Sequence, residues 1–180
     1  YQMVEKKGPF FEKSVQSIED VNRLNVPDVE DNLHYVMEAI RITKRELNGR
    51  VPLIGFAGAP WTIFSYMIEG QGSKTFSKAK KMLYTNPDLA HALLQKISLT
   101  TIDYLKAQIK AGADLVQLFD SWSGILTHQQ YIEFGIKYVD QICNAINDVP
   151  VTVFSKGAYF ARKELGELNC NTIGLDWNMA

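Results

Sequence analysis

The sequence predicts an α/β protein, a partial (β/α)8 TIM barrel in which short parallel strands alternate with helices. Short, continuously apolar segments recur after longer segments with helical hydrophobic spacing, and only short turns separate them. No GxGxxG or GxxxxGK[ST] motif follows any of the strands, which favours the barrel over a nucleotide-binding doubly wound sheet. Since a whole barrel takes about 250 residues, we expect residues 1–180 to be a single domain that forms the central portion of a barrel.

Each expected element follows from a local pattern. Residues 1–11 read as an extended segment. Pro27-Asp28 introduces a helix with an apolar stripe that ends at Asn48-Gly49, and the apolar run 51–57 is the first strand, with Pro52 at its start. A long helix runs from Asn86-Pro87 to Gly112 and precedes a strand at 113–119. The later pairs are helix 129–146 with strand 149–154, and helix 158–168 with strand 172–176.

The strands carry almost no polar residues, and this predicts helices on both faces of the sheet. The composition adds further limits. Nineteen basic and 20 acidic residues leave a net charge of −1, which argues against a nucleic-acid or membrane-surface protein, and no apolar run is long enough to cross a bilayer. Cys143 and Cys170 lack CxxC spacing and a neighbouring His, so we expect reduced, buried thiols, no metal site and a cytoplasmic location.

Binding residues are expected on the loops that follow the strands, because parallel sheets place their sites at the carboxyl ends. Around the end of the first strand, glycines at 55 and 58 allow close approach of a ligand or a neighbouring strand, and Phe56, Trp61 and Tyr66 are suited to lining a cavity for a planar ligand. The alternative is that these aromatic residues belong to the core and the glycines only form turns.

The other strand ends supply further candidates. Asp120 and Ser121 offer a carboxylate and a hydroxyl after the second strand, and Lys156 follows the third. No GxSxG motif surrounds a serine, so a Ser-His-Asp triad is not predicted. The three histidines are expected to be surface or capping residues, with His34 and His91 on helices and His128 at a helix start.

Three segments together resemble the uroporphyrinogen decarboxylase family: GFAGAPWTIFSYMIEGQGS at 55–73, LVQLFDSWSG at 115–124 and GLDW at 174–177. The resemblance implies a single-domain TIM barrel, usually a homodimer, that acts in haem and porphyrin biosynthesis without a metal or organic cofactor. Such a lyase converts the four acetate side chains of uroporphyrinogen to the methyls of coproporphyrinogen.

The resemblance also implies roles for individual residues. Tyr66 and Ser121 match polar residues close to the substrate's acetate and propionate groups, and Phe56 matches an aromatic residue of the cavity wall. The family's arginine, aspartate and histidine that act on the substrate have no match here, so we assign no catalytic residue and expect this chain to be inactive alone. Two alternatives are a related zinc- or corrinoid-type methyltransferase barrel and a non-catalytic half-barrel module.

Overall fold

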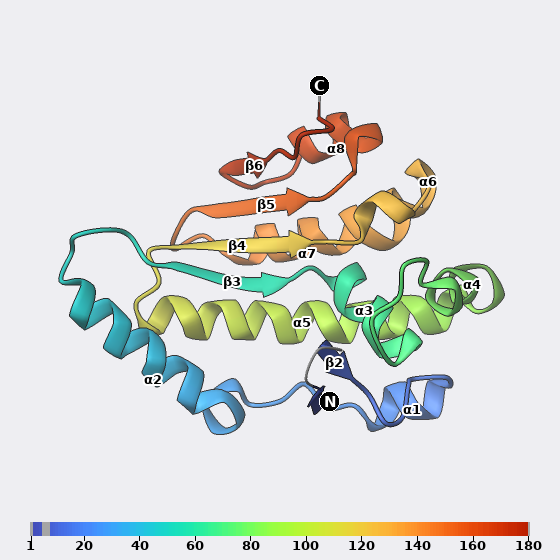
Figure 1. The fold of residues 1–180 in the computed structure, drawn as a ribbon, viewed down its shortest axis with the longest axis horizontal. Helices are drawn as coiled ribbons and strands as arrows, with labels where there is room; N and C mark the ends of the chain where they lie inside the picture. Colours follow the sequence, from blue (N-terminus) through green and yellow to red (C-terminus); the bar gives the residue numbers. More distant parts are fainter. Residues whose placement is uncertain (1, 5–7, 180) are drawn as a thin grey trace.

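The computed structural model of the protein describes residues 2–4 and 8–179. These residues form a parallel sheet with strands in chain order, β3-β4-β5-β6, together with an antiparallel hairpin of β1 and β2 (Figure 1). The strands are β1 (Gln2–Val4), β2 (Gly8–Phe10), β3 (Ile54–Gly58), β4 (Leu115–Asp120), β5 (Val151–Ser155) and β6 (Thr172–Gly174). The predicted parallel α/β arrangement is confirmed, and the described part of the extended segment at 1–11 is the hairpin.

Helices precede the sheet and separate its strands. They are α1 (Ile18–Arg23), α2 (Val29–Leu47), α3 (Pro60–Glu69), α4 (Ser77–Thr85), α5 (Pro87–Ala111), α6 (His128–Tyr131), α7 (Lys137–Ala145) and α8 (Arg162–Gly166). The predicted helix 129–146 is α6, a π-helical turn at Ile132–Ile136 and α7 in succession. The predicted helix 158–168 is shorter than expected, because it opens with a 3-10 turn at Tyr159–Ala161 before α8 begins.

The ends of the long helices follow the expected capping chemistry. The Asp28 side chain accepts the Asp31 N–H at the start of α2, and Asn48 adopts a left-handed conformation at its end. The Asn86 side chain accepts the Leu89 N–H at the start of α5, directly before Pro87. Local sequence therefore determines where these two helices begin and end.

The strands begin later than the apolar runs that predict them. Pro52 has no N–H to donate, and β3 begins only at Ile54. Pro150 has the same effect on β5, which begins at Val151 instead of residue 149. β4 begins at Leu115, after Asp114 has donated its N–H to Leu53 O at 2.8 Å.

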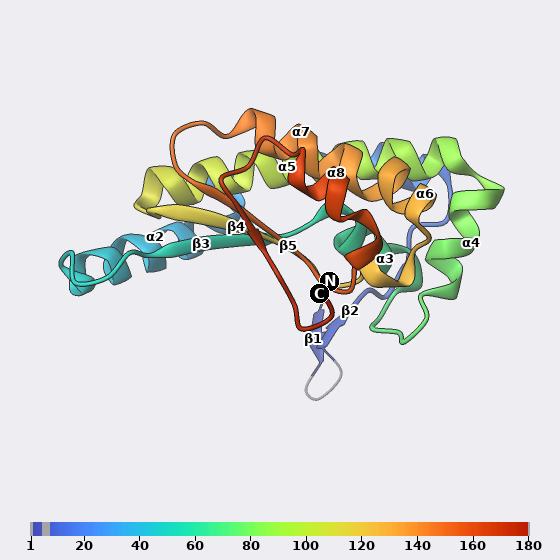
Figure 2. The same cartoon turned by 90° about the horizontal axis from the view of Figure 1, so that it is seen from above.

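The prediction that both faces of the sheet are covered is wrong for this chain. The helices α5 and α7 lie on one side of the strands (Figure 2). On the other face, Phe56 is 61% exposed, Ile54 50% and Phe119 37%. Apolar composition correctly indicated that both faces of the sheet carry apolar side chains. The described helices, however, cover only one of these faces.

Alternation along β4 separates the two faces. Val116, Leu118 and Asp120 are fully buried, whereas Phe119 between them is exposed. Since side chains of a strand point alternately to opposite faces, the buried set lies against the helices and Phe119 lies on the open face. We call this uncovered side of β3, β4 and β5 the open face.

Candidate functional site

The carboxyl ends of β3, β4 and β5 meet at one edge of the sheet. Gly58 at the end of β3 is in register with Phe119, and Asp120 at the end of β4 is in register with Ser155. The loop after β4 therefore lies between those that follow β3 and β5. Ser121 begins this loop and its side chain is exposed.

Three phenylalanines form a row across the open face close to this edge. Phe56 meets Phe119 edge to face with ring centroids 6.0 Å apart, and Phe119 meets Phe154 in the same way at 6.1 Å. We call Phe56, Phe119 and Phe154 the phenyl row; their rings form an apolar wall in the favoured edge-to-face geometry. The resemblance predicted Phe56 as a wall residue, but Phe119 and Phe154 had not been proposed. The period-two alternation of their strands could have identified both.

Tyr66 comes to the same region on helix α3. Pro60 occupies the first turn of this helix, and Gly70 ends it in a left-handed conformation. Tyr66 is partly buried, and its hydroxyl accepts a hydrogen bond from Nε1 of Trp122 at 3.2 Å. This bond joins α3 to the loop that contains Ser121.

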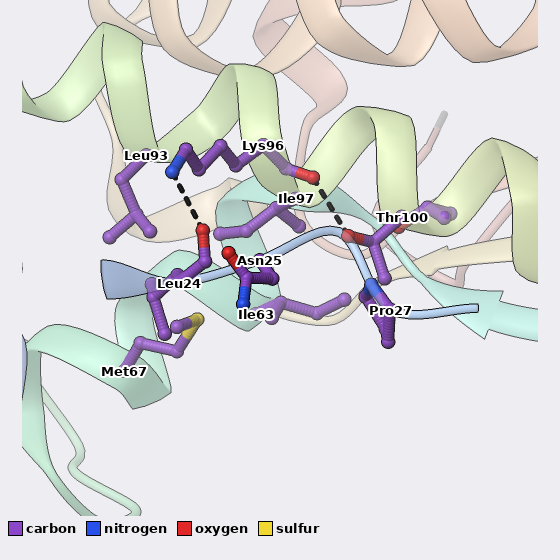
Figure 3. A pocket seen from close by; sticks show the side chains of 10 residues that line it. Leu24, Asn25, Pro27, Ile63, Met67, Leu93, Lys96, Ile97 and Thr100 are labelled. Atoms are coloured by element: carbon purple, nitrogen blue, oxygen red, sulfur yellow. Dashed lines mark hydrogen bonds between the residues drawn. The ribbon is translucent and has the colours of Figure 1, made fainter. Parts of the chain in front are cut away.

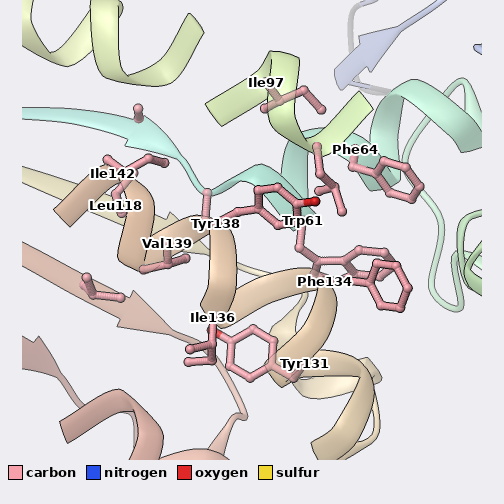
Figure 4. Packing of buried hydrophobic residues seen from close by; sticks show 14 of the residues in the cluster. Trp61, Phe64, Ile97, Leu118, Tyr131, Phe134, Ile136, Tyr138, Val139 and Ile142 are labelled. Carbon is pink, nitrogen blue, oxygen red and sulfur yellow. The ribbon is translucent and has the colours of Figure 1, made fainter. Parts of the chain in front are cut away.

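Trp61 does not line a cavity. It is fully buried and stacks on Phe64 with centroids 5.5 Å apart (Figure 4). Its indole N–H donates to the backbone oxygen of Trp122 at 3.0 Å. The cavity interpretation is wrong for Trp61 because a helix that begins at Pro60 turns this side chain into the core, so that Trp61 instead fixes the loop after β4.

The two glycines of β3, Gly55 and Gly58, approach side chains of the protein itself. A Cβ on Gly55 would lie 2.8 Å from Oε1 of Gln108, and one on Gly58 would lie 3.1 Å from Cγ1 of Ile63. The predicted close approach to the Gly55 backbone is therefore present, and the groups that approach it are side chains of this chain. Packing within the chain requires a glycine at position 55.

Asp120 belongs to a buried polar cluster beneath the loop. Its Oδ1 accepts a hydrogen bond from the Thr62 hydroxyl at 2.8 Å, and nearby the hydroxyls of Tyr131 and Ser155 are 2.7 Å apart. Burial raises the pKa of Asp120 to about 6, against the opposing effect of donors on Thr62, Tyr131 and Trp122. Among the described residues, no donor reaches hydrogen-bonding geometry with Oδ2. Asp120 thus links α3 to β4 from the helix-covered side.

The candidate Lys156 after β5, and Asp176 after β6, stabilise the loops through backbone and carboxylate groups. The Lys156 carbonyl accepts the Gly124 N–H at 3.0 Å and the Ser123 hydroxyl at 2.9 Å, while the Lys156 side chain is exposed. The Asp176 carboxylate accepts the Gly157 N–H at 2.6 Å. These bonds fix the edge of the sheet next to Ser121.

The histidines take the surface and helical positions that the sequence indicates. His34 lies on α2, His91 lies on α5 with Nδ1 2.7 Å from the Tyr138 hydroxyl, and His128 opens α6 with Nε2 2.9 Å from Glu164. Within residues 2–4 and 8–179, no group of three or more His, Cys, Asp or Glu could hold a metal ion.

Both cysteines are free thiols. Cys143 is buried as expected, and burial raises its pKa to about 12. Cys170 is only partly buried, so the prediction of two buried thiols is wrong for this residue. In the described part of the chain, no helix is both long and apolar enough to cross a membrane.

A separate apolar cavity of about 210 Å³ lies between α3, α5 and the segment before α2 (Figure 3). Ile63 and Met67 of α3 line one side, and Leu93 and Ile97 of α5 line another. The Lys96 ammonium donates to Leu24 O at 2.7 Å and is thus engaged with the backbone. None of the phenyl row, Tyr66 or Ser121 lines this cavity, so the candidate site is the open face and its edge.

The fold defines the class: a parallel α/β protein of the TIM-barrel type, with the candidate site at the carboxyl ends of its strands. A methyltransferase from Methanosarcina mazei has the same fold, with a TM-score of 0.81 at 17% identity over 99% of this chain and 53% of that one. The predicted partial (β/α)8 fold is thereby confirmed.

Sequence comparison identifies the family. The family model for uroporphyrinogen decarboxylase matches residues 1–180, and the chain belongs to the uroporphyrinogen decarboxylase family. It is 53% identical over 176 residues to the uroporphyrinogen decarboxylase of Flavobacterium johnsoniae, covering 97% of this chain and 52% of that protein. The protein of the same name from Christiangramia forsetii is 52% identical over 171 residues, 94% of this chain and 50% of the relative. The chain thus spans about half the length of these relatives.

Proposed function

We propose that the whole protein is a uroporphyrinogen decarboxylase and that residues 1–180 are the central portion of its single barrel domain. The observation that carries the proposal is that the apolar phenyl row lies on the open face close to the edge where Ser121 begins the loop after β4, and that Trp122 of this loop donates to the Tyr66 hydroxyl. A tetrapyrrole substrate has apolar ring faces and a carboxylate periphery, and this surface offers complementary groups for both. The family match over all 180 residues supports the same reaction.

The chemistry requires groups that this chain supplies only in part. Loss of carbon dioxide from a pyrrole acetate leaves carbanion-like charge, which is dispersed if the ring is first protonated. The protein must therefore provide a proton donor, hold the pyrrole N–H groups and orient the carboxylates. Hydroxyl groups orient carboxylates well but are poor acids at neutral pH, so we assign Tyr66 and Ser121 to positioning and Phe56 to the apolar wall.

The parts of the relatives that this chain does not match are proposed to contribute the remaining catalytic groups. On this proposal the reaction needs no metal or organic cofactor, and the whole protein is a cytoplasmic homodimer. Residues 1–180 alone are then inactive, and coproporphyrinogen formed by the isolated piece would contradict that statement.

The test is conversion of uroporphyrinogen to coproporphyrinogen by the full-length protein. We expect activity in the parent and a loss of about tenfold or more in kcat/KM for Tyr66→Phe and for Ser121→Ala, since each removes a hydrogen bond to a charged group. Tyr84→Phe removes the same hydroxyl from a residue on α4 that is 72% exposed and serves as the matched control. A parent protein that contains stoichiometric zinc and transfers methyl groups would instead identify the methyltransferase class.

A further inference from the structure

Tyr66 and Trp122 form a hydrogen bond whose direction is fixed by their chemistry. Nε1 of Trp122 lies 3.2 Å from the Tyr66 hydroxyl oxygen. An indole N–H can only donate, so the tyrosine oxygen must be the acceptor and keeps its own proton for another partner. The indole therefore orients the phenol so that its own O–H can serve as a donor.

Phe76 packs against both rings of this pair. Its ring meets Tyr66 edge to face with centroids 5.4 Å apart, and it meets Trp122 at 4.7 Å and 58°. Phe76 is fully buried and has a φ of 44°, a left-handed conformation that a bulky residue rarely adopts. Such a conformation persists only where the surrounding structure enforces it. Here the Ser73 hydroxyl accepts the Phe76 N–H at 3.1 Å, and the Phe76 carbonyl accepts the Lys80 N–H at 2.9 Å.

The backbone that supports Trp122 is fixed independently. Its carbonyl accepts the Trp61 indole N–H at 3.0 Å, and the residue two positions earlier, Asp120, is held by Thr62 at 2.8 Å. Trp61 and Thr62 both belong to α3, the helix that also contains Tyr66. The donor indole and the acceptor phenol are thus set on two segments that are joined at two points besides their own bond.

We propose that Trp122 and Phe76 are positioning residues for Tyr66: the indole N–H and the Phe76 ring hold the phenol so that its O–H points to a substrate carboxylate. This inference rests on the proposed function, in which Tyr66 contacts the substrate. It adds two residues that act through Tyr66 and do not themselves touch the reacting groups.

The first test is a double-mutant cycle on the full-length protein, with kcat/KM for uroporphyrinogen as the readout. We expect Trp122→Phe to lower kcat/KM about tenfold in the parent and less than about twofold in a Tyr66→Phe background, because the hydroxyl it orients is already gone. Phe76→Leu, which keeps both members of the bond, should show the same dependence and serves if Trp122→Phe does not fold. An equal loss in both backgrounds would mean that Trp122 has a merely structural role. That result would overturn this inference and leave the proposed function standing.

The second test observes the hydrogen bond without activity. The indole Nε1–H resonance of Trp122, identified by its disappearance in Trp122→Phe, should shift upfield in Tyr66→Phe and stay in place in Tyr84→Phe. An unshifted resonance would overturn the inference even in an active enzyme. If the resonance shifts but Tyr66→Phe retains full kcat/KM, the role of Tyr66 in the proposed function falls, and the positioning role falls with it.

Discussion

The Gln108 side-chain amide forms hydrogen bonds with both backbone groups of Phe56. Nε2 donates to the Phe56 carbonyl at 2.9 Å, and Oε1 accepts the Phe56 N–H at 3.0 Å. Gln108 is buried on α5, so the outermost strand β3 is joined to the helix layer directly behind the wall residue. A side chain thus takes the place of a neighbouring strand for this residue.

Replacing Gln108 with methionine should destabilise the protein. Methionine fills a similar volume but leaves both Phe56 backbone groups unpaired, which costs about 1–3 kcal/mol in the free energy of unfolding. Gln95→Met on the exposed side of the same helix is the control and should change stability by less than about 0.5 kcal/mol. Urea unfolding of the full-length variants measures both, and equal stability of the two variants would show that the amide bonds contribute nothing net.

Gly55→Ala should disturb the same contact. The added Cβ would lie 2.8 Å from Oε1 of Gln108 and 3.1 Å from Cβ of Ala113, so the amide must move away from Phe56. Overpacking of this kind costs about 1–3 kcal/mol. Gly166→Ala, where a Cβ meets nothing within 4 Å, should be neutral or slightly stabilising. Thermal unfolding compares the two, and a tolerated Gly55→Ala would contradict the close contact.

Asp120 should make the protein less stable as the pH rises. Its folded-state pKa of about 6 exceeds the ordinary 3.8, so between these values the folded state keeps a proton that the unfolded state has lost. One pKa unit corresponds to about 1.4 kcal/mol, and full ionisation therefore costs on the order of 3 kcal/mol. Asp120→Asn stays neutral and keeps a carbonyl for Thr62, so its stability relative to the parent should improve from about pH 4 to pH 7.

Urea unfolding of full-length parent and variant across this range measures the difference. Asp148→Asn, at an exposed position, should show no such rise in relative stability. A pH-independent difference between Asp120→Asn and the parent would mean that the carboxyl ionises in the folded state as it does in the unfolded chain.

Asp114 should have the opposite pH dependence. The Leu53 N–H, followed by the Lys44 ammonium, lowers the pKa of this carboxyl below its ordinary value of 3.8. Its ionised form therefore stabilises the fold above that value, and the contribution is lost as the pH falls through the lower folded-state pKa. Asp114→Asn should be less stable than the parent at neutral pH, with a difference that shrinks under acid conditions. Asp103→Asn, exposed on α5, is the control in the same unfolding measurements.

The isolated residues 1–180 should associate in solution. The open face leaves Phe56 and Ile54 in contact with water, and the outer edges of β3 and β6 have no partner strand among the described residues. Light scattering should show oligomers whose size grows with concentration. The double variant Ile54→Lys, Phe56→Lys should form smaller oligomers. A monodisperse monomer at high concentration would contradict this prediction.

Local patterns were sufficient for most of the fold and for part of the site. The caps at Asp28 and Asn86 and the left-handed Asn48 depend on short-range hydrogen bonds, so the sequence placed the ends of α2 and α5. Motif resemblance selected Phe56, Tyr66 and Ser121, and the structure puts all three near one edge of the sheet. The predicted cavity-lining role of Trp61 was wrong because its phase on α3, and not its proximity to the other candidates in the sequence, decides which face its side chain occupies.

The sequence by itself determined the α/β class, the order of the elements and the family, because all three are recorded in periodicity, turn residues and contiguous motifs. Only the tertiary structure decided that Gln108 meets Phe56, that Trp122 donates to Tyr66 and that Asp120 lies in the helix-covered layer. The two residues of each contact, Gln108 with Phe56, Trp122 with Tyr66 and Asp120 with Thr62, lie 52 to 58 residues apart along the chain. Such contacts leave no local pattern, since they arise only when the packing of helix on sheet brings distant segments together.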